Sequence, residues 1–160
     1  MANIPVPPEE LHPSLKDSII VPSDVRAFIA DTPSNNHLLD DVEFDDRRIW
    51  LAIRMAVSEY NETPPVTRVT ASIFPGMATL IYGACYHLFS GQAALAARNQ
   101  MSYSDGGLNV PIEERYGMYQ QLAQYYGQLW STAVRNTKSH RNLESGWGYV
   151  NSDYSTFPNW

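Results

Sequence analysis

Four stretches of the chain carry apolar residues at helical spacing, and prolines or glycines separate each stretch from the next. The segment MATLIYGACYHLFSGQAALAARN is the most apolar of them and has one large apolar face. Its small residues, Gly83, Ala84 and Gly91 among them, allow a second helix to approach closely. We therefore predict a mainly α fold, a bundle of about four helices, in which this segment is the core helix.

Capping residues and prolines indicate where the helices begin and end. Pro22-Ser23-Asp24 is suited to begin a short helix, and Phe44 before Asp45-Asp46 is typical of a hydrophobic staple followed by a cap. Pro75 and Pro111 suit the first turns of two later helices, because a first turn leaves its amide hydrogens unpaired and proline has none. The expected helices span about 22–31, 45–61, 75–99 and 111–143.

The remaining segments are expected to be extended or turned. The segment 66–74, VTRVTASIF, alternates β-branched residues, which predicts a short strand or an extended connector. Asp105-Gly106-Gly107 supplies the residues of a tight turn and predicts a small β-hairpin before the last helix. Prolines in residues 1–20 predict an extended N-terminal arm, and 144–160 has no helical period. The helical bundle domain is thus expected at 21–143, between two extended arms.

The C-terminal tail is unusually rich in large aromatic residues, namely Trp147, Tyr149, Tyr154, Phe157 and Trp160. Disordered linkers are normally poor in such residues, and exposed rings gain nothing from staying in water. We therefore expect the tail to lie on a surface, either on its own domain or on a neighbouring subunit.

No pattern in the sequence predicts catalysis, and we expect no cofactor, no bound metal and no enzymatic activity. The glycines at 106–107 lack the Lys-Ser/Thr of a phosphate-binding loop, and the acidic run at 40–46 lacks the spacing of a calcium loop. Cys85 lies in an apolar run, where a buried structural role is expected. His87 is expected to be a core or interface histidine rather than a metal ligand.

Charge is unevenly distributed along the chain. The net charge of -6 argues against DNA binding by bulk electrostatics. Most acids precede residue 63, whereas Arg135, Lys138 and Arg141 form a basic cluster expected at the end of the last helix. This division suits a protein that contacts its copies or partners through opposite ends. The chain has no apolar run long enough to cross a membrane and no secretion signal, so we expect a soluble protein made in the cytoplasm of the producing cell.

Several segments together resemble a known family. They are the helix IWLAIRMAVSEYN followed by two prolines, the small-residue helix LIYGACYHLFSGQAAL, the link RNQMSYSDGGLNV, and a long helix whose end reads KSHRNLESGWG. Over about residues 20–145 this layout resembles the helical head-to-tail adaptor, or connector, proteins of tailed bacteriophages.

The resemblance implies a structural virion protein at the neck, where the capsid joins the tail. It implies a homododecameric ring beneath the portal protein, a helical bundle around a channel through which DNA passes without specific binding, and a further neck or tail protein below. Portal contacts are expected from the C-terminal residues Leu143, Trp147, Tyr149, Tyr154, Phe157 and Trp160. Contacts to a neighbouring subunit or to the tail are expected from the hairpin, at Tyr103, Asp105, Gly106, Gly107 and Leu108. Acids lining the channel would repel phosphate.

Other functions remain open at this point. The proline-rich arm and the aromatic tail are not demanded by the resemblance and also suit another neck, tail-completion or baseplate ring protein. A helical module that binds a small molecule or peptide would use the tyrosines of the last helix, Tyr116, Tyr119, Tyr125 and Tyr126, as its pocket lining. An enzyme whose site is assembled only in three dimensions is a third possibility.

Overall fold

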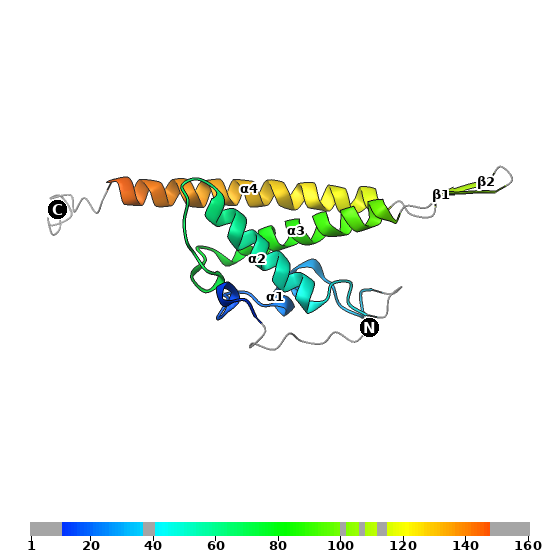
Figure 1. Cartoon of the computed structure of the whole chain (residues 1–160), viewed down its shortest axis with the longest axis horizontal. Coiled ribbons are helices and arrows are strands. Elements are labelled where there is room, and N and C mark those ends of the chain that lie inside the picture. The colour runs from blue at the N-terminus through cyan, green and yellow to red at the C-terminus, as the bar shows by residue number, and fades with distance from the viewer. Residues whose placement is uncertain (1–10, 37–40, 100–101, 106–107, 112–114, 148–160) are drawn as a thin grey trace, which may run out of the picture.

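The computed structural model describes residues 11–36, 41–99, 102–105, 108–111 and 115–147. Its elements are, in order, the 3₁₀-helix η2 (Pro13–Leu15), α1 (Pro22–Ile29), α2 (Asp46–Glu62), the 3₁₀-helix η3 (Ala71–Ile73), α3 (Met77–Arg98), β1 (Ser102–Asp105), β2 (Leu108–Pro111) and α4 (Arg115–Trp147). The mainly helical fold is thus confirmed, with four α-helices among the described residues (Figure 1).

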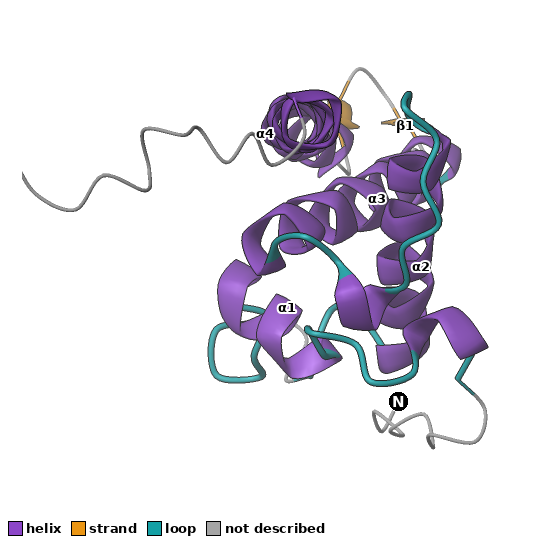
Figure 2. Ribbon diagram, turned by 90° about the vertical axis from the view of Figure 1, so that its left-hand side faces the viewer, coloured by secondary structure: helices purple, strands orange, loops and turns teal. Residues whose placement is uncertain are grey.

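The helices form layers, with α3 in the middle. α2 and α1 pack on one side of α3, and α4 runs along the other side (Figures 1 and 2). β1 and β2 pair antiparallel, with Tyr103 opposite Val110 and Asp105 opposite Leu108. Figure 1 places this pair at the end of the molecule where α3 ends and α4 begins, far from the C-terminal end of α4.

The expected cap accounts for the beginning of α2, whereas the cap expected at Pro22-Ser23-Asp24 was wrong for α1. The Asp45 carboxylate accepts a hydrogen bond from the Arg48 amide at 2.6 Å, as an N-cap should. In α1 the N-cap is Val21, and Pro22 is already the first helical residue. The carboxylate of Asp24, which lies in the first turn of α1, accepts a hydrogen bond from the Val21 amide at 2.8 Å.

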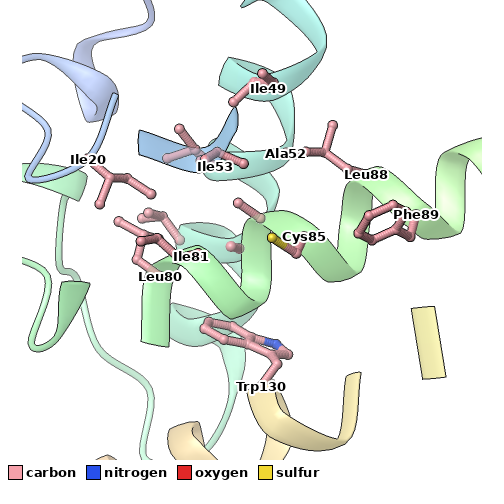
Figure 3. Close-up of a cluster of buried hydrophobic side chains, with 14 of the residues drawn as sticks. Ile20, Ile49, Ala52, Ile53, Leu80, Ile81, Cys85, Leu88, Phe89 and Trp130 are labelled. Atoms are coloured by element: carbon pink, nitrogen blue, oxygen red, sulfur yellow. The ribbon is translucent and has the colours of Figure 1, made fainter. Parts of the chain in front are cut away.

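Apolar side chains from all three layers meet in one core (Figure 3). Ile49 and Ile53 of α2 and Leu80 of α3 are fully buried, and Trp130 brings α4 into the same cluster with 2% of its surface exposed. The Trp130 ring stacks on Phe74 with centroids 6.4 Å apart. α3, the core helix predicted from the sequence, therefore packs against the helices on both of its sides.

Gly83 allows the three layers to approach closely. A Cβ atom at this position would lie 2.7 Å from the Ala56 Cβ of α2 and 2.8 Å from Cε3 of Trp130 on α4. Contacts this short do not occur between real carbon atoms, so α2, α3 and α4 meet here only because residue 83 has no side chain. The sequence also predicted that Gly91 allows a second helix to approach closely. This prediction was wrong, because no described atom lies within 4 Å of a Cβ atom built at Gly91.

A buried carboxylate holds the segment before α2 in place. Asp31, 4% exposed, accepts hydrogen bonds from the Glu43 amide at 2.7 Å, the Phe44 amide at 3.0 Å and the Asn36 side chain at 2.5 Å. Arg26 donates to the Phe44 carbonyl at 2.7 Å and pairs with Asp46 at 2.5 Å. These contacts fix the loop that leads from α1 into α2.

The expected boundary of the N-terminal arm was wrong for part of its length. Residues 13–15 form η2, and the side chains of Leu15 and Ile20 are buried in the core. The Ile19 amide donates to the Ala71 carbonyl at 3.1 Å, which joins this segment to η3. The domain therefore begins before residue 20, because a 3₁₀ turn tolerates proline in its first position and two large apolar side chains gain by burial. Residues 1–10 lie outside the described part of the chain.

Several other expected boundaries move, and α1 ends at Ile29 rather than near Asp31. α2 ends at Glu62 rather than Asn61, and α3 begins at Met77, with Gly76 as its N-cap and Pro75 before it. Segment 66–74 is a connector with one 3₁₀ turn, and no strand is assigned there. Pro111 belongs to β2, so the described start of α4 is Arg115. At the other end α4 continues to Trp147, so the first four residues of the expected tail are helical.

Candidate interaction surface

α4 is a long helix, and from Arg115 to Leu143, where burial is described, only a narrow strip of it is buried. Its 33 residues span about 50 Å at 1.5 Å per residue. The buried residues follow one line along the helix and are Tyr119, Ala123, Trp130, Val134 and Lys138. A strip this narrow suffices to pack α4 on α3 and leaves most of the helix circumference open.

Three sets of contacts fix α4 along this strip. Near its start, the Tyr119 hydroxyl donates to Glu43, whose carboxylate also accepts from Gln92 at 3.2 Å. Burial, with the Glu43 hydrogen bond as a further cause, raises the pKa of Tyr119 to about 12, so the phenol stays protonated. In the middle, Trp130 packs on Gly83. These contacts join α4 to α3 and to the loop before α2, so α4 is held as one rigid element.

The third contact corrects the interpretation of the basic cluster. Lys138 is 3% exposed, and its ammonium donates to the Pro65 carbonyl and the Thr67 hydroxyl, both at 2.8 Å. It also lies 4.1 Å from the centre of the Tyr60 ring. Burial and the neighbouring Arg141 lower the pKa of Lys138. Arg135 and Arg141 are exposed, as expected, whereas Lys138 is a structural residue that ties α4 to the connector after α2.

We expect Lys138→Ala to lower the free energy of unfolding by about 2 kcal/mol, because it leaves the Pro65 carbonyl and Thr67 hydroxyl without their charged donor. Arg135→Ala removes an exposed cation one turn earlier and should change stability by less than about 0.5 kcal/mol. Urea denaturation of both variants measures the difference. Equal stabilities would show that the Lys138 contacts contribute nothing.

Between Arg115 and Leu143 the open surface of α4 combines apolar and polar residues and lacks acids. Met118, Tyr125 and Leu143 are 51%, 56% and 58% exposed. From Arg115 to Leu143 the helix has no aspartate or glutamate, and neither has α3. Large exposed apolar side chains on a helix that is already anchored are typical of a contact surface for another protein.

Two hollows flank α4. One, of 330 Å³, lies between the end of α2 and the second half of α4 and is lined by Pro64, Pro65, Trp130, Arg135 and Asn142 among others. The second, of 460 Å³, lies between α3 and α4, and its lining includes four alanines together with Tyr86 and Tyr116.

The tyrosines predicted as a pocket lining do not gather around one hollow. Tyr116 lines the α3–α4 hollow, but Tyr119 is buried against Glu43. Tyr126 stacks on Phe89, with ring centroids 5.5 Å apart, and Tyr125 is exposed on the surface. The four side chains therefore serve different contacts, which removes the main sequence argument for a small-molecule site.

Those of the expected contact residues that the structure describes lie toward the two ends of α4. Leu143 is exposed near its C-terminal end, which Figure 1 shows extending past the ends of α2 and α3. Trp147 is the last residue of the helix, whereas Tyr149, Tyr154, Phe157 and Trp160 lie outside the described residues. At the other end, the backbones of Tyr103, Asp105 and Leu108 belong to the strand pair. Gly106 and Gly107 lie outside the described residues.

Cys85 and His87 are in structural positions. Cys85 is fully buried, and burial raises its pKa to about 12, which keeps the thiol unreactive. His87 Nε2 lies 3.0 Å from a Glu59 carboxylate oxygen between α3 and α2. Burial lowers the pKa of His87, and Glu59 opposes that shift. The described residues contain no group of three metal-ligating side chains, and none of their helices is long and apolar enough to cross a membrane.

The chain was compared with protein-family models, curated proteins and solved structures. No protein-family model, no curated protein and no solved structure matches the chain.

Proposed function

We propose that the chain is a structural assembly protein of a tailed phage, a head-to-tail adaptor whose copies form a ring between portal and tail. The observation that carries the proposal is the geometry of α4. It is one continuous helix of about 50 Å with a narrow buried strip, exposed apolar residues and a different contact element at each end. This arrangement suits a structural element that holds two binding partners at a fixed distance from each other.

In this proposal the C-terminal end of α4 faces the portal protein and the strand pair faces a neighbouring copy or the next tail component. The exposed Leu143 provides an apolar contact, and Arg141 provides a charged one. A ring repeats this contact once in each subunit. The overall affinity of the ring for the portal is then much higher than that of one subunit, because once the first subunits have bound, the others are held close to their binding sites. The protein would act in the virion neck as a homo-oligomer, twelve-fold if it follows the family that it resembles.

The distribution of acids refines the expected channel. α3 and the described part of α4 up to Leu143 carry no acidic residue. Any acids that repel the phosphates of passing DNA would therefore have to come from other parts of the chain, so the open surface of α4 is better suited to contact protein.

The proposal is tested with the portal protein of the same genome. Mass measurement in solution and negative-stain imaging should show rings, either alone or on the portal. Removing residues 144–160 should abolish portal binding, and Leu143→Asp should weaken it by about 10-fold to 100-fold, since burial of a leucine contributes about 1.5–3 kcal/mol. Thermal unfolding should change little, because Leu143 is 58% exposed.

The matched control is Ile73→Asp. Ile73 is similarly exposed, at 63%, and lies in η3, outside the open surface of α4. This variant should leave portal affinity unchanged. A truncated chain that still binds the portal, or a chain that stays a monomer with the portal present, would overturn the proposed function.

A further inference from the structure

A second surface, on the opposite side of the molecule from α4, also has the features of a binding site. The α2 groove is a hollow of 280 Å³ between residues 11–15 and the outward face of α2. Its lining consists of Leu11, His12, Leu15, Arg47, Trp50, Leu51 and Arg54. Leu15 is buried and Trp50 half-buried, which makes the floor apolar, while Arg47 and Arg54 are exposed on the rim.

The α2 groove continues into an open apolar strip on the same helix. Leu51 is 55% exposed and Met55 is 49% exposed, and they are separated by one helical turn. Arg47, Trp50, Leu51 and Arg54 share a face because their spacing is three, four and seven residues. The surface therefore offers apolar contact flanked by two cations, a combination that fits an extended segment with both apolar and acidic residues.

Residues 1–10 of this chain have that composition and start from the right place. They read MANIPVPPEE, with Ile4 and Val6 as apolar residues and Glu9-Glu10 as adjacent acids. The next residue, Leu11, already lines the α2 groove together with Arg47 and Arg54, and the two acids directly precede Leu11 in the sequence. Ten proline-rich residues reach about 31 Å when extended, whereas Arg47 and Met55 are about 12 Å apart along α2. The segment is thus long enough to cover the whole strip.

We propose that residues 1–10 dock on the α2 groove of their own chain, with Glu9 and Glu10 against Arg47 and Arg54 and the apolar residues along Leu51 and Met55. Own-chain docking is favoured because no linker separates the segment from its site, which makes its effective concentration there high. The prolines also limit the conformations that the unbound segment can adopt, which reduces the entropic cost of docking. The docked segment would cover Leu51 and Met55, which are otherwise open to solvent. This inference does not depend on the proposed role in a phage neck.

Disulfide formation in the full-length chain tests the proposal. Val6→Cys combined with Leu51→Cys should form an intramolecular disulfide under mild oxidation, and Cys85 will not compete because it is buried with its pKa raised to about 12. The matched control combines Val6→Cys with Met118→Cys, a site of similar exposure on α4. We expect the first pair to form at least 10-fold faster than the control pair at low ionic strength.

Charge reversal identifies what holds the segment. Adding Arg47→Glu and Arg54→Glu to the first pair should slow disulfide formation several-fold, and adding Glu9→Arg and Glu10→Arg as well should restore it. Mass spectrometry separates linkage within one chain from linkage between chains. Equal rates for the two cysteine pairs, or no response to the charge changes, would overturn the proposal. Linkage found only between chains would overturn own-chain docking and show that the segment covers the α2 groove of a neighbouring copy.

Discussion

Gly83→Ala is expected to lower the free energy of unfolding by about 1–3 kcal/mol, although alanine is the better helix former. The new methyl group would lie 2.7 Å from the Ala56 Cβ and 2.8 Å from the Trp130 ring. Neither neighbour is the flexible end of a long side chain, so α2 or α4 must move away from α3 to admit the methyl group. Urea denaturation followed by circular dichroism measures the loss.

Gly91→Ala is the matched control for this prediction. It makes the same substitution two turns later in α3, where a Cβ atom would have no described neighbour within 4 Å. The variant should gain up to about 1 kcal/mol from helix propensity alone. If both variants gained stability, the close approach of three helices at Gly83 would be refuted.

Asp31→Ala is expected to lower the free energy of unfolding by about 3 kcal/mol. The carboxylate is 4% exposed and accepts from the Glu43 and Phe44 amides at 2.7 and 3.0 Å. Alanine would leave these donors without their acceptor in a part-buried loop, and hydrogen bonds to a charged group contribute about 1.5–3 kcal/mol. Denaturant midpoints provide the measurement, and amide exchange at Glu43 and Phe44 should increase in parallel.

The comparison for Asp31 is Asp45→Ala. Asp45 is exposed and caps α2 through one hydrogen bond to the Arg48 amide at 2.6 Å, so its loss should cost about 1 kcal/mol. A loss at Asp31 no larger than the loss at Asp45 would contradict a special role for the buried carboxylate.

The helices were predictable because their signals are local. One short segment contains both the signals for α2, namely the apolar spacing of Ile49, Ile53 and Val57 and the cap at Asp45. These signals predict both ends of α2 to within one residue. The Asp31 contacts were not predictable, because they join residues twelve and thirteen positions apart across a loop without periodicity. Lys138 is a similar case, since its partners at 65 and 67 are more than seventy positions away.

The errors at the two ends of the domain have a common cause. The prolines before residue 20 and the missing helical period after residue 143 were both interpreted as signs of extended segments, and this interpretation was wrong for part of each segment. At the N-terminal end, Leu15 and Ile20 gain more from the core than an extended arm offers. At the C-terminal end, α4 continues through Gly146 to Trp147, since one glycine costs only about 1 kcal/mol in a long helix. The exposed Leu143 agrees with its predicted contact role, which stays a prediction.

Because α4 is one continuous helix, insertions within it would change both the distance and the relative direction of its two ends. Each residue inserted between Gly127 and Arg135 would lengthen the helix by about 1.5 Å and turn everything beyond it by about 100°. A single insertion would therefore rotate Leu143 away from its original direction while leaving the strand pair unchanged. Insertions of seven or eleven residues would restore the original direction to within about 20°, and they would add about 10 Å or about 16 Å. The number of residues in α4 thus sets both the distance and the relative direction between Leu143 and the strand pair.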